Sequence, residues 1–304
     1  MAKAQQVTVV GSAALDTLIT PHGSVEDILG GSVSFIGAIG GLFVPFNIVS
    51  VVGDDFPMHE YGFLRERNVN LDGLEIAPGK TFRWSGKYHD NMNIRDTLST
   101  SLGVFADFQP HLPVLARDAK YLLLANINPE LQLQVLDQMS APKLVAFDTM
   151  NLWINAARET VLEVIGRVDI VIVNDEEINL LTGESSLFAG ALKLTMMGPS
   201  YVVVKKGEHG SILVGKKGVP FICPAFPIAD PVDPTGAGDT FAGAMIGYLA
   251  ATDDVGFFNL RQAIVYGTIA ASFTVEDFGL NRLKSITIDD IEERFRLFRA
   301  MVEF

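Results

Sequence analysis

The stretch Asp233-Pro-Thr-Gly-Ala-Gly-Asp-Thr240 runs directly into the apolar segment Phe241-Ala-Gly-Ala-Met-Ile-Gly-Tyr-Leu-Ala250. This pattern predicts a glycine turn that opens a helix, with the Asp239 carboxylate in the first helical turn. The first N–H groups of a helix lack intrahelical partners, and the helix dipole adds partial positive charge there. Small residues let an anion approach those groups closely: Gly236, Ala237 and Gly238. A carboxylate beside such a cradle predicts a base that takes a proton from a hydroxyl attacking a phosphoryl group, although Asp is also a favourable dipole partner.

Composition narrows the class of protein. The 304 residues allow one large α/β domain with an appendage, or two domains. Hydrophobic content of 48% with 19% charged residues is typical of an ordered globular protein. The net charge of −13 argues against nucleic-acid and acidic-membrane partners. The single cysteine, Cys223, excludes an intrachain disulfide, fits a reducing compartment and is expected to be a buried structural thiol.

No segment is predicted to enter a membrane. Residues 1–6 are too short and polar for a signal peptide. The most apolar stretch, residues 35–53, is interrupted by Pro45, Asn47 and Ser50, so a helix followed by a buried strand explains it better than a bilayer span. We expect a soluble, cytoplasmic protein.

Short apolar, β-rich runs alternate with helical patterns along the chain. The predicted strands are residues 7–10, 47–52, 121–125, 144–147, 169–173 and 201–205, and the helical windows are 129–139, 157–164 and 187–197. This alternation predicts an α/β fold with a doubly wound, mostly parallel sheet covered on both faces. Ligands of such sheets bind beyond the carboxyl ends of the strands. Polar residues follow several of these strands: Asp16, Asn126, Asp148, Asn174 and Lys206.

One segment departs from the alternation. Residues 81–105 are rich in Thr, Ser and aromatic residues and indicate two half-exposed strands around the polar turn Asp90-Asn-Met-Asn93. Together with residues 13–29 they are predicted to form a small β-sheet lid on a single domain spanning residues 1–304, the alternative being an ordinary surface hairpin. Near the C-terminus, Thr287-Ile-Asp-Asp290 predicts a capping box that opens a final helix.

The 233–240 stretch resembles the Asp-Thr-x-Gly-Ala-Gly-Asp signature of the ribokinase-like (PfkB) family of carbohydrate kinases, and departs from it only at Pro234. Other segments resemble further motifs of this family, in the expected order along nearly the whole chain. The resemblance implies a Rossmann-like core and a β lid that pairs in a homodimer. It also implies ATP as donor, with Mg²⁺, and transfer to a hydroxyl, usually a primary one.

The resemblance also assigns the nucleotide side of the site. Asp239 would be the base and residues 236–238 the anion hole. Asn174 and Glu177 fit an Asn-x-x-Glu motif that organises Mg²⁺ and the phosphates, with Glu177 acting through water; an acid-rich first helical turn is the alternative. Asp233 stands where some members hold K⁺. A Lys-x-Gly-x-x-Gly turn and the glycine turn imply further nucleotide contacts: Lys206, Gly207, Gly210 and Thr235.

On the acceptor side, Asp16 resembles the aspartate with which the family grips sugar hydroxyls. Gly30 and Gly31 resemble a Gly-Gly pair that contacts the acceptor through its backbone. Phe35 stands where many members carry Asn, and we expect it to shape the pocket. Asp148 resembles part of an Asp-x-Asn stretch, here with one extra residue before the Asn.

The acceptor itself stays open between a small sugar, a polyol and a nucleoside, and we favour a neutral one. A phosphosugar would need a basic group, and the lid offers Arg83, Lys87 and Arg95. An NAD-dependent oxidoreductase would need Gly-x-Gly-x-x-Gly after the first strand, where the chain reads only Gly11-Ser-Ala-Ala. A non-catalytic nucleotide or sugar sensor is the other alternative, and the intact Asp239 argues against it.

Overall fold

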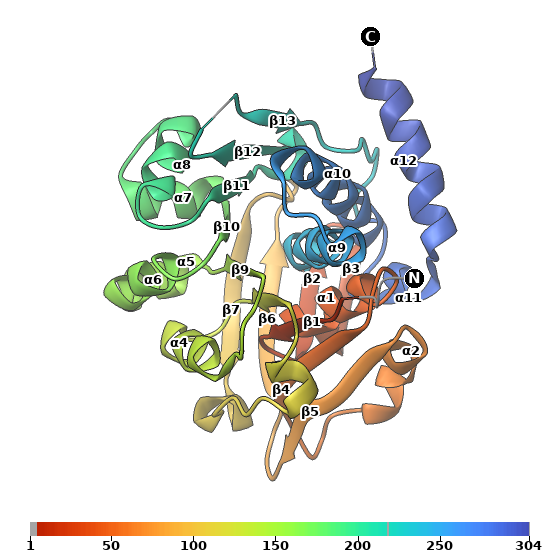
Figure 1. Ribbon diagram of the computed structural model, residues 1–304. Coiled ribbons are helices and arrows are strands. Elements are labelled where there is room, and N and C mark those ends of the chain that lie inside the picture. The colour runs from red at the N-terminus through yellow and green to blue at the C-terminus, as the bar shows by residue number, and fades with distance from the viewer. Residues whose placement is uncertain (1–4, 218, 304) are drawn as a thin grey trace.

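The computed structural model describes residues 5–217 and 219–303, and it confirms the predicted α/β fold (Figure 1). The predicted domain ends, residues 1 and 304, lie outside the described residues. A nine-stranded sheet has the order β13-β12-β11-β10-β9-β8-β1-β4-β5. Its strands are β1 (Val7–Val10), β4 (Phe46–Gly53), β5 (Val69–Ala77), β8 (Tyr121–Leu124), β9 (Leu144–Asp148), β10 (Ile170–Asn174), β11 (Tyr201–Lys205), β12 (Ser211–Gly215) and β13 (Phe221–Cys223).

From β5 across to β11, neighbouring strands pair in parallel, and only β12 and β13 are antiparallel additions. The central strands are buried on both faces. In β1, Val7 and Val9 belong to one hydrophobic cluster, whereas Val10 belongs to the other. This burial explains the continuous apolar runs in the sequence. The carboxyl ends of the parallel strands therefore meet at one edge of the sheet.

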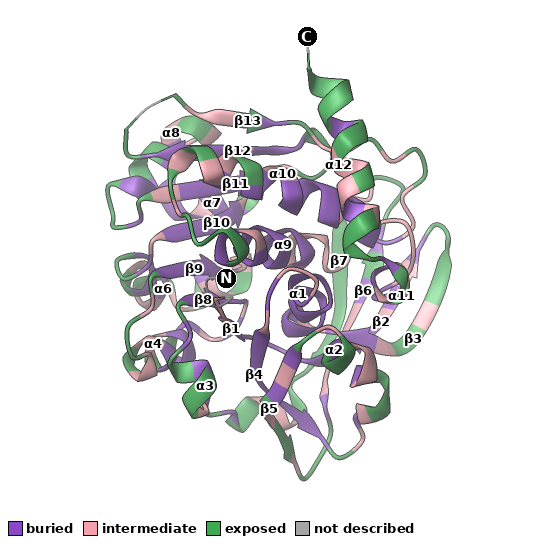
Figure 2. Cartoon of the chain, turned by 45° about the vertical axis from the view of Figure 1, so that its right-hand side comes forward, coloured by how far each residue is buried: buried purple, intermediate pink, exposed green. Residues whose placement is uncertain are grey.

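Helices cover both faces of the sheet (Figures 1 and 2). One face carries α1 (Ser32–Gly40), α2 (Gly62–Glu66), α9 (Ala237–Thr252), α10 (Phe257–Thr274), α11 (Asn281–Ser285) and α12 (Ile288–Val302). The other carries α3 (Val114–Arg117), α4 (Pro129–Gln138), α5 (Asn151–Ala156), α6 (Arg158–Ile165), α7 (Asp175–Thr182) and α8 (Leu187–Thr195). Short 3₁₀ turns are η1 (Met58–Tyr61), η2 (Gly103–Asp107) and η3 (Gly207–His209). The predicted capping box at Thr287 and Asp290 opens α12. In the described part of the chain, no helix combines the length and apolarity that crossing a membrane requires.

A second, four-stranded sheet has the order β3-β2-β6-β7. Its strands are β2 (Ala14–Thr20), β3 (Gly23–Gly30), β6 (Phe82–Tyr88) and β7 (Arg95–Ser101). The central pair β2–β6 is parallel, and both outer pairs are antiparallel. Asp16 lies in β2 of this small sheet, so our placement of Asp16 at the end of the first strand was wrong. Asp16 therefore belongs to the lid, within the predicted lid segment 13–29, and its role toward the acceptor stays a prediction.

The base of the lid is anchored to the end of β4. The Asp55 carboxylate accepts hydrogen bonds from the Thr81 N–H at 2.8 Å and from the Thr81 hydroxyl at 2.7 Å. Arg83 pairs with the same carboxylate at 2.8 Å and with Asp27 at 3.0 Å. These bonds hold the pKa of Asp55 below its usual range, although its partial burial opposes the shift. Asp55 therefore has a structural role at this turn.

Candidate active site

The glycine turn opens α9 as the sequence predicts. Gly236 is the N-cap and has a left-handed backbone with φ 75°, and a Cβ there would overlap the Phe35 ring. Both constraints favour glycine. The Ala237 N–H donates to the Pro234 carbonyl at 3.2 Å. No hydrogen bond between described residues occupies the N–H of Gly238 or Asp239. The N–H of Gly236 is likewise without a hydrogen bond to described residues, and the predicted anion hole at residues 236–238 stays a prediction. We refer to the two unbonded N–H groups of Gly238 and Asp239, at the start of α9, as the cradle.

Asp239 lies half-buried beside this cradle. Burial, together with the nearby Asp148 charge, raises the pKa of its carboxyl to about 7, although Lys205 and Arg95 act in the opposite direction. A base works best when its pKa lies close to the pH at which it operates. A carboxyl with this pKa gains and loses its proton near neutral pH, and the role of Asp239 as the base stays a prediction.

Asp233 holds the turn in place. Its two carboxylate oxygens accept hydrogen bonds from the N–H groups of Thr235 and Gly279, each at 2.9 Å, and the residue is fully buried. These bonds connect the glycine turn to the loop before α11. They give Asp233 a structural function of its own, and its role toward K⁺ stays a prediction.

Lys205 is a functional candidate that the sequence analysis missed. Its Nζ lies 3.0 Å from Asp148 Oδ2 and 3.1 Å from the position that a Cβ on Gly238 would take. Burial disfavours the ammonium charge, but Asp148 and Glu177 outweigh that effect and raise the pKa of Lys205. A half-buried, charged ammonium group therefore lies against the cradle.

The neighbouring Lys206 is placed differently. Its N–H donates to the Gly210 carbonyl at 2.8 Å and closes the turn between β11 and β12. Lys205 ends β11 and is the register partner of Asn174 in β10. The signal for Lys205 was present in the sequence, because it is the first residue of the Lys-x-Gly pattern.

Asn174 and Glu177 form a capping box at the start of α7. The Asn174 N–H donates to Glu177 Oε2, and the Glu177 N–H donates to Asn174 Oδ1, both at 2.8 Å. Burial raises the pKa of Glu177, although Lys205 lowers it. The cap engages one carboxylate oxygen and leaves Oε1 without a hydrogen bond to the described residues.

The oxygen groups at this edge fit a magnesium–nucleotide complex, because Mg²⁺ prefers one or two carboxylates together with phosphate oxygens and water. The residues available are Glu177 and, beside it, Asp148. Among residues 5–217 and 219–303, no group of three or more His, Cys, Asp and Glu side chains is arranged to hold a metal ion by itself. An ion at this edge would therefore take most of its ligands from phosphate and water.

On the acceptor side, the Gly-Gly pair makes room for Asp16. A Cβ on Gly30 would overlap the Asp16 carboxylate, and Gly31 has a φ of 81° with the Ser12 carbonyl close by. Burial raises the pKa of Asp16 to about 7; the Gly31 N–H lowers it, and the carboxylates of Asp233 and Asp239 raise it. The acceptor aspartate thus lies near the predicted base.

Phe35 lies in α1 and is 1% exposed. Its ring supports Gly236 from below. The structure therefore places Phe35 beneath the glycine turn, where it shapes the site through that turn and not through an open pocket wall.

The lid contacts both turns that flank the site. The Thr235 hydroxyl donates to the Tyr88 hydroxyl at 3.1 Å, and Asn93 Nδ2 donates to Glu208 Oε1 at 3.0 Å. Thr235 belongs to the glycine turn and Glu208 to η3. The hairpin formed by β6 and β7 therefore spans from the cradle to the turn after β11.

Residues 38–286 match the family model described as pfkB family carbohydrate kinase. The chain belongs to this family. It is 31% identical to a cytidine kinase from Thermococcus kodakarensis over 79% of this chain and 87% of that protein. The resemblance found in the sequence is confirmed, and this pfkB-family protein is a sugar or nucleoside kinase.

Two solved structures share the fold of this kinase. The nucleoside kinase from Methanocaldococcus jannaschii has a TM-score of 0.76 at 21% identity and covers 98% of this chain and 100% of its own. An Arabidopsis thaliana ribokinase complexed with ribose and ATP has a TM-score of 0.76 at 21% identity, with coverage of 97% and 99%. At these identities the likeness concerns the fold alone.

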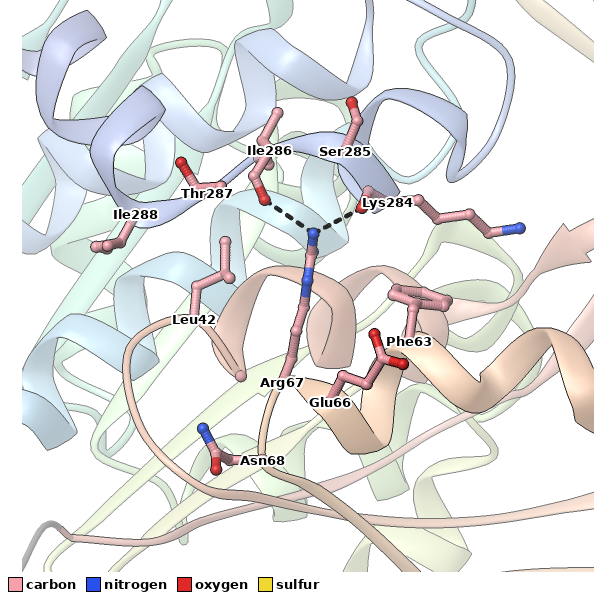
Figure 3. Close-up of a pocket in the computed structure, with 11 residues that line it drawn as sticks. Leu42, Phe63, Glu66, Arg67, Asn68, Lys284, Ser285, Ile286, Thr287 and Ile288 are labelled. Atoms are coloured by element: carbon pink, nitrogen blue, oxygen red, sulfur yellow. Dashed lines mark hydrogen bonds between the residues drawn. The ribbon is translucent and has the colours of Figure 1, made fainter.

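A pocket of about 430 Å³ lies at the opposite edge of the kinase's large sheet (Figure 3). It adjoins Asn68, whose carbonyl accepts from the N–H of Phe46, the first residue of β4. The Arg67 guanidinium donates to three backbone carbonyls from α1 and the end of α11: Ala38, Lys284 and Ile286. Arg67 therefore links α1 to the end of α11 through hydrogen bonds. The pocket is separate from the Asp239 site.

Proposed function

We propose that this kinase transfers the γ-phosphoryl group of ATP to a hydroxyl, usually a primary one, of a small sugar, polyol or nucleoside, with Asp239 as the base. The observation that carries the proposal is the half-buried Asp239 carboxyl, with a pKa raised to about 7, beside two free N–H groups at the start of α9. A base and an anion cradle side by side are the two groups that this reaction needs.

In this reaction the acceptor oxygen bonds to the γ-phosphorus while the bond to the bridging oxygen of ADP breaks. Asp239 takes the proton of the attacking hydroxyl. The N–H groups of Gly238 and Asp239 and the Lys205 ammonium lie where negative charge develops on the phosphoryl oxygens. Catalysis then consists mostly of alignment and charge stabilisation.

The nucleotide is proposed to lie along the carboxyl ends of β10 and β11. Mg²⁺ bound with ATP would neutralise phosphate charge, with Glu177 holding one of its water ligands and Asn174 orienting Glu177. The turn residues already named for this side would contact the nucleotide: Lys206, Gly207, Gly210 and Thr235. The ATP in the Arabidopsis ribokinase, which has the same fold, supports this choice of donor.

A neutral acceptor is favoured over a phosphosugar. Of the three lid cations that a second phosphate would use, Arg83 is already paired with Asp27 and Asp55. Asp16 and the acceptor side of the cradle carry negative charge, which disfavours a phosphorylated acceptor. A non-catalytic sensor would have no use for the Asp239 carboxylate beside the cradle.

Replacement Asp239→Asn tests the assignment of the base. We expect turnover with the best acceptor to fall by roughly 10²–10⁴, while ATP binding stays close to that of the parent protein. An ATP-coupled assay over nucleosides and sugars, with calorimetric ATP titration, measures both effects. Asp175→Asn, an exposed acid in the first turn of α7, is the matched control. Parent-level turnover in Asp239→Asn would remove Asp239 from the mechanism.

A further inference from the structure

One face of the lid sheet places an aromatic side chain beside the acceptor aspartate. In the parallel pair β2–β6, Asp16 is the register partner of Trp84, and Leu18 is the partner of Gly86. Paired residues of neighbouring strands have their side chains on the same face of a sheet, about 5 Å apart. Asp16 and Trp84 therefore project from the same face as neighbours.

The Trp84 indole lies across Gly86. A Cβ on Gly86 would overlap the six-membered ring of the indole, so the absence of a side chain there lets the ring rest on the strand. The indole Nε1 donates to the Thr97 hydroxyl at 3.3 Å, and Arg95 Cζ lies 5.7 Å from the ring centroid. Contacts from two strands thus hold the ring in one orientation on the lid.

This face of the lid is turned toward the reaction centre. Tyr88, two residues beyond Gly86 on β6, bonds the Thr235 hydroxyl of the glycine turn. The next side chain on the opposite face, Lys87, is exposed. Trp84 is only partly buried, unlike Phe35, the aromatic residue that lies sealed beneath the turn. The indole therefore lies partly exposed next to Asp16, with the Arg95 guanidinium over its ring.

We propose that Trp84 is a stacking platform for a nucleobase, and that the acceptor of this kinase is a nucleoside whose ribose hydroxyls face Asp16. The inference rests on the proposed function and names its acceptor class. An indole supported by a strand binds any flat heteroaromatic ring through its π-face. A sugar lacking a base would satisfy Asp16 but leave the platform unused.

Fluorescence tests the platform without turnover. The chain contains two tryptophans, so Trp153→Phe in α5 leaves Trp84 as the sole indole reporter. We expect cytidine to quench the Trp84 fluorescence of this variant saturably. Ribose and fructose at the same concentrations should leave the fluorescence unchanged. Absence of quenching at cytidine concentrations well above its KM would overturn the platform.

Steady-state kinetics test the same inference independently. Trp84→Ala should raise KM for the nucleoside by about tenfold to a hundredfold and leave KM for ATP unchanged, as base stacking on an aromatic side chain predicts. Trp84→Phe should retain most of the affinity. Gly86→Ala should act in the same direction as Trp84→Ala because it displaces the indole. Ser85→Ala, between them on the opposite face, is the control and should leave KM unchanged.

The outcomes separate this inference from the proposed function. Nucleoside phosphorylation with an unchanged KM in Trp84→Ala overturns the platform and leaves Asp239 catalysis intact. Phosphorylation of sugars alone overturns the nucleoside acceptor, again without affecting Asp239. If no acceptor is phosphorylated at all, the proposed function fails, and the quenching experiment still decides whether Trp84 binds a base.

Discussion

The two sheets of this kinase differ in how they are buried (Figure 2). All eight residues of β4 in the large sheet are buried, whereas all seven residues of β7 in the lid are exposed. The groups proposed for phosphoryl transfer stand at the ends of doubly covered strands and at the start of α9. The groups proposed to recognise the acceptor, Asp16 and Trp84, stand on the sheet that has one side in water. The comparison suggests that rate depends on the core sheet and acceptor choice on the lid.

After Asp239→Asn, Lys205→Gln should have the largest effect, and it tests the core side of this comparison. Removing a charged donor aimed at the transferring group lowers kcat by roughly 10²–10³. KM for the acceptor should change little, since Lys205 stands on β11 and not on the lid. Stopped-time assays at saturating ATP measure kcat, with thermal melting to check folding. Lys206→Gln removes the same charge one residue later, and an equal loss in that variant would restore Lys206 to the role first predicted.

Asp16→Ala tests the lid side. Loss of a carboxylate that accepts hydrogen bonds from hydroxyls should lower kcat/KM for the acceptor by roughly 10–10², because the acceptor hydroxyls are left without their partner. ATP binding should stay at the parent level. Acceptor titrations at fixed ATP give kcat/KM for the acceptor. Thr17→Ala, on the opposite face of the lid sheet, is the control. An Asp16→Ala protein that bound ATP poorly would mean that the lid and core functions are not separate.

The pH dependence is the smallest expected effect and belongs to Asp239. The base acts as a carboxylate, so kcat/KM should fall about tenfold per pH unit below pH 7, where its pKa of about 7 leaves it protonated. The folded-state pKa lies above the ordinary 3.8, so folding favours the protonated form, and stability is lost as pH rises from 3.8 to about 7. Asp239→Asn should therefore raise Tm at pH 8 and change it little at pH 4, which melting curves at both pH values would show.

The sequence predicted the buried parts of the fold better than the edges. The central strands β1, β8, β9, β10 and β11 were found because burial on both faces leaves an unbroken apolar run. The edge strand β5 was missed because it carries polar residues such as Asn70, Asp72 and Glu75 on its open side. The edge strand β13 and its antiparallel neighbour β12 were missed as well, in a region where only a turn had been noted.

For the candidate site, the sequence revealed short local motifs but could not reveal contacts between segments that are distant along the chain. The Asn-x-x-Glu pattern drew attention to Asn174 and Glu177, and the same spacing places the two side chains together in a capping box. Lys205 and Lys206 are adjacent, and only the pleat of β11 decides which ammonium group reaches the cradle. The support of Gly236 by Phe35 joins two segments far apart in the chain, so no local pattern could indicate it.

The two side-chain bonds that fasten the lid, Tyr88 to Thr235 and Asn93 to Glu208, bear on the timing of turnover. If the acceptor enters beneath the lid, these two hydrogen bonds must break on its entry. They must break again when the phosphorylated product leaves. Each bond contributes only about 0.5–3 kcal/mol, so opening is frequent, but a nucleotide bracing the η3 turn would hold the lid down over the product. We therefore expect opening of the lid, and not phosphoryl transfer, to be the slow event of the cycle. The first molecule of product would then form in a burst, and the rate of each later turnover would equal the rate of lid opening.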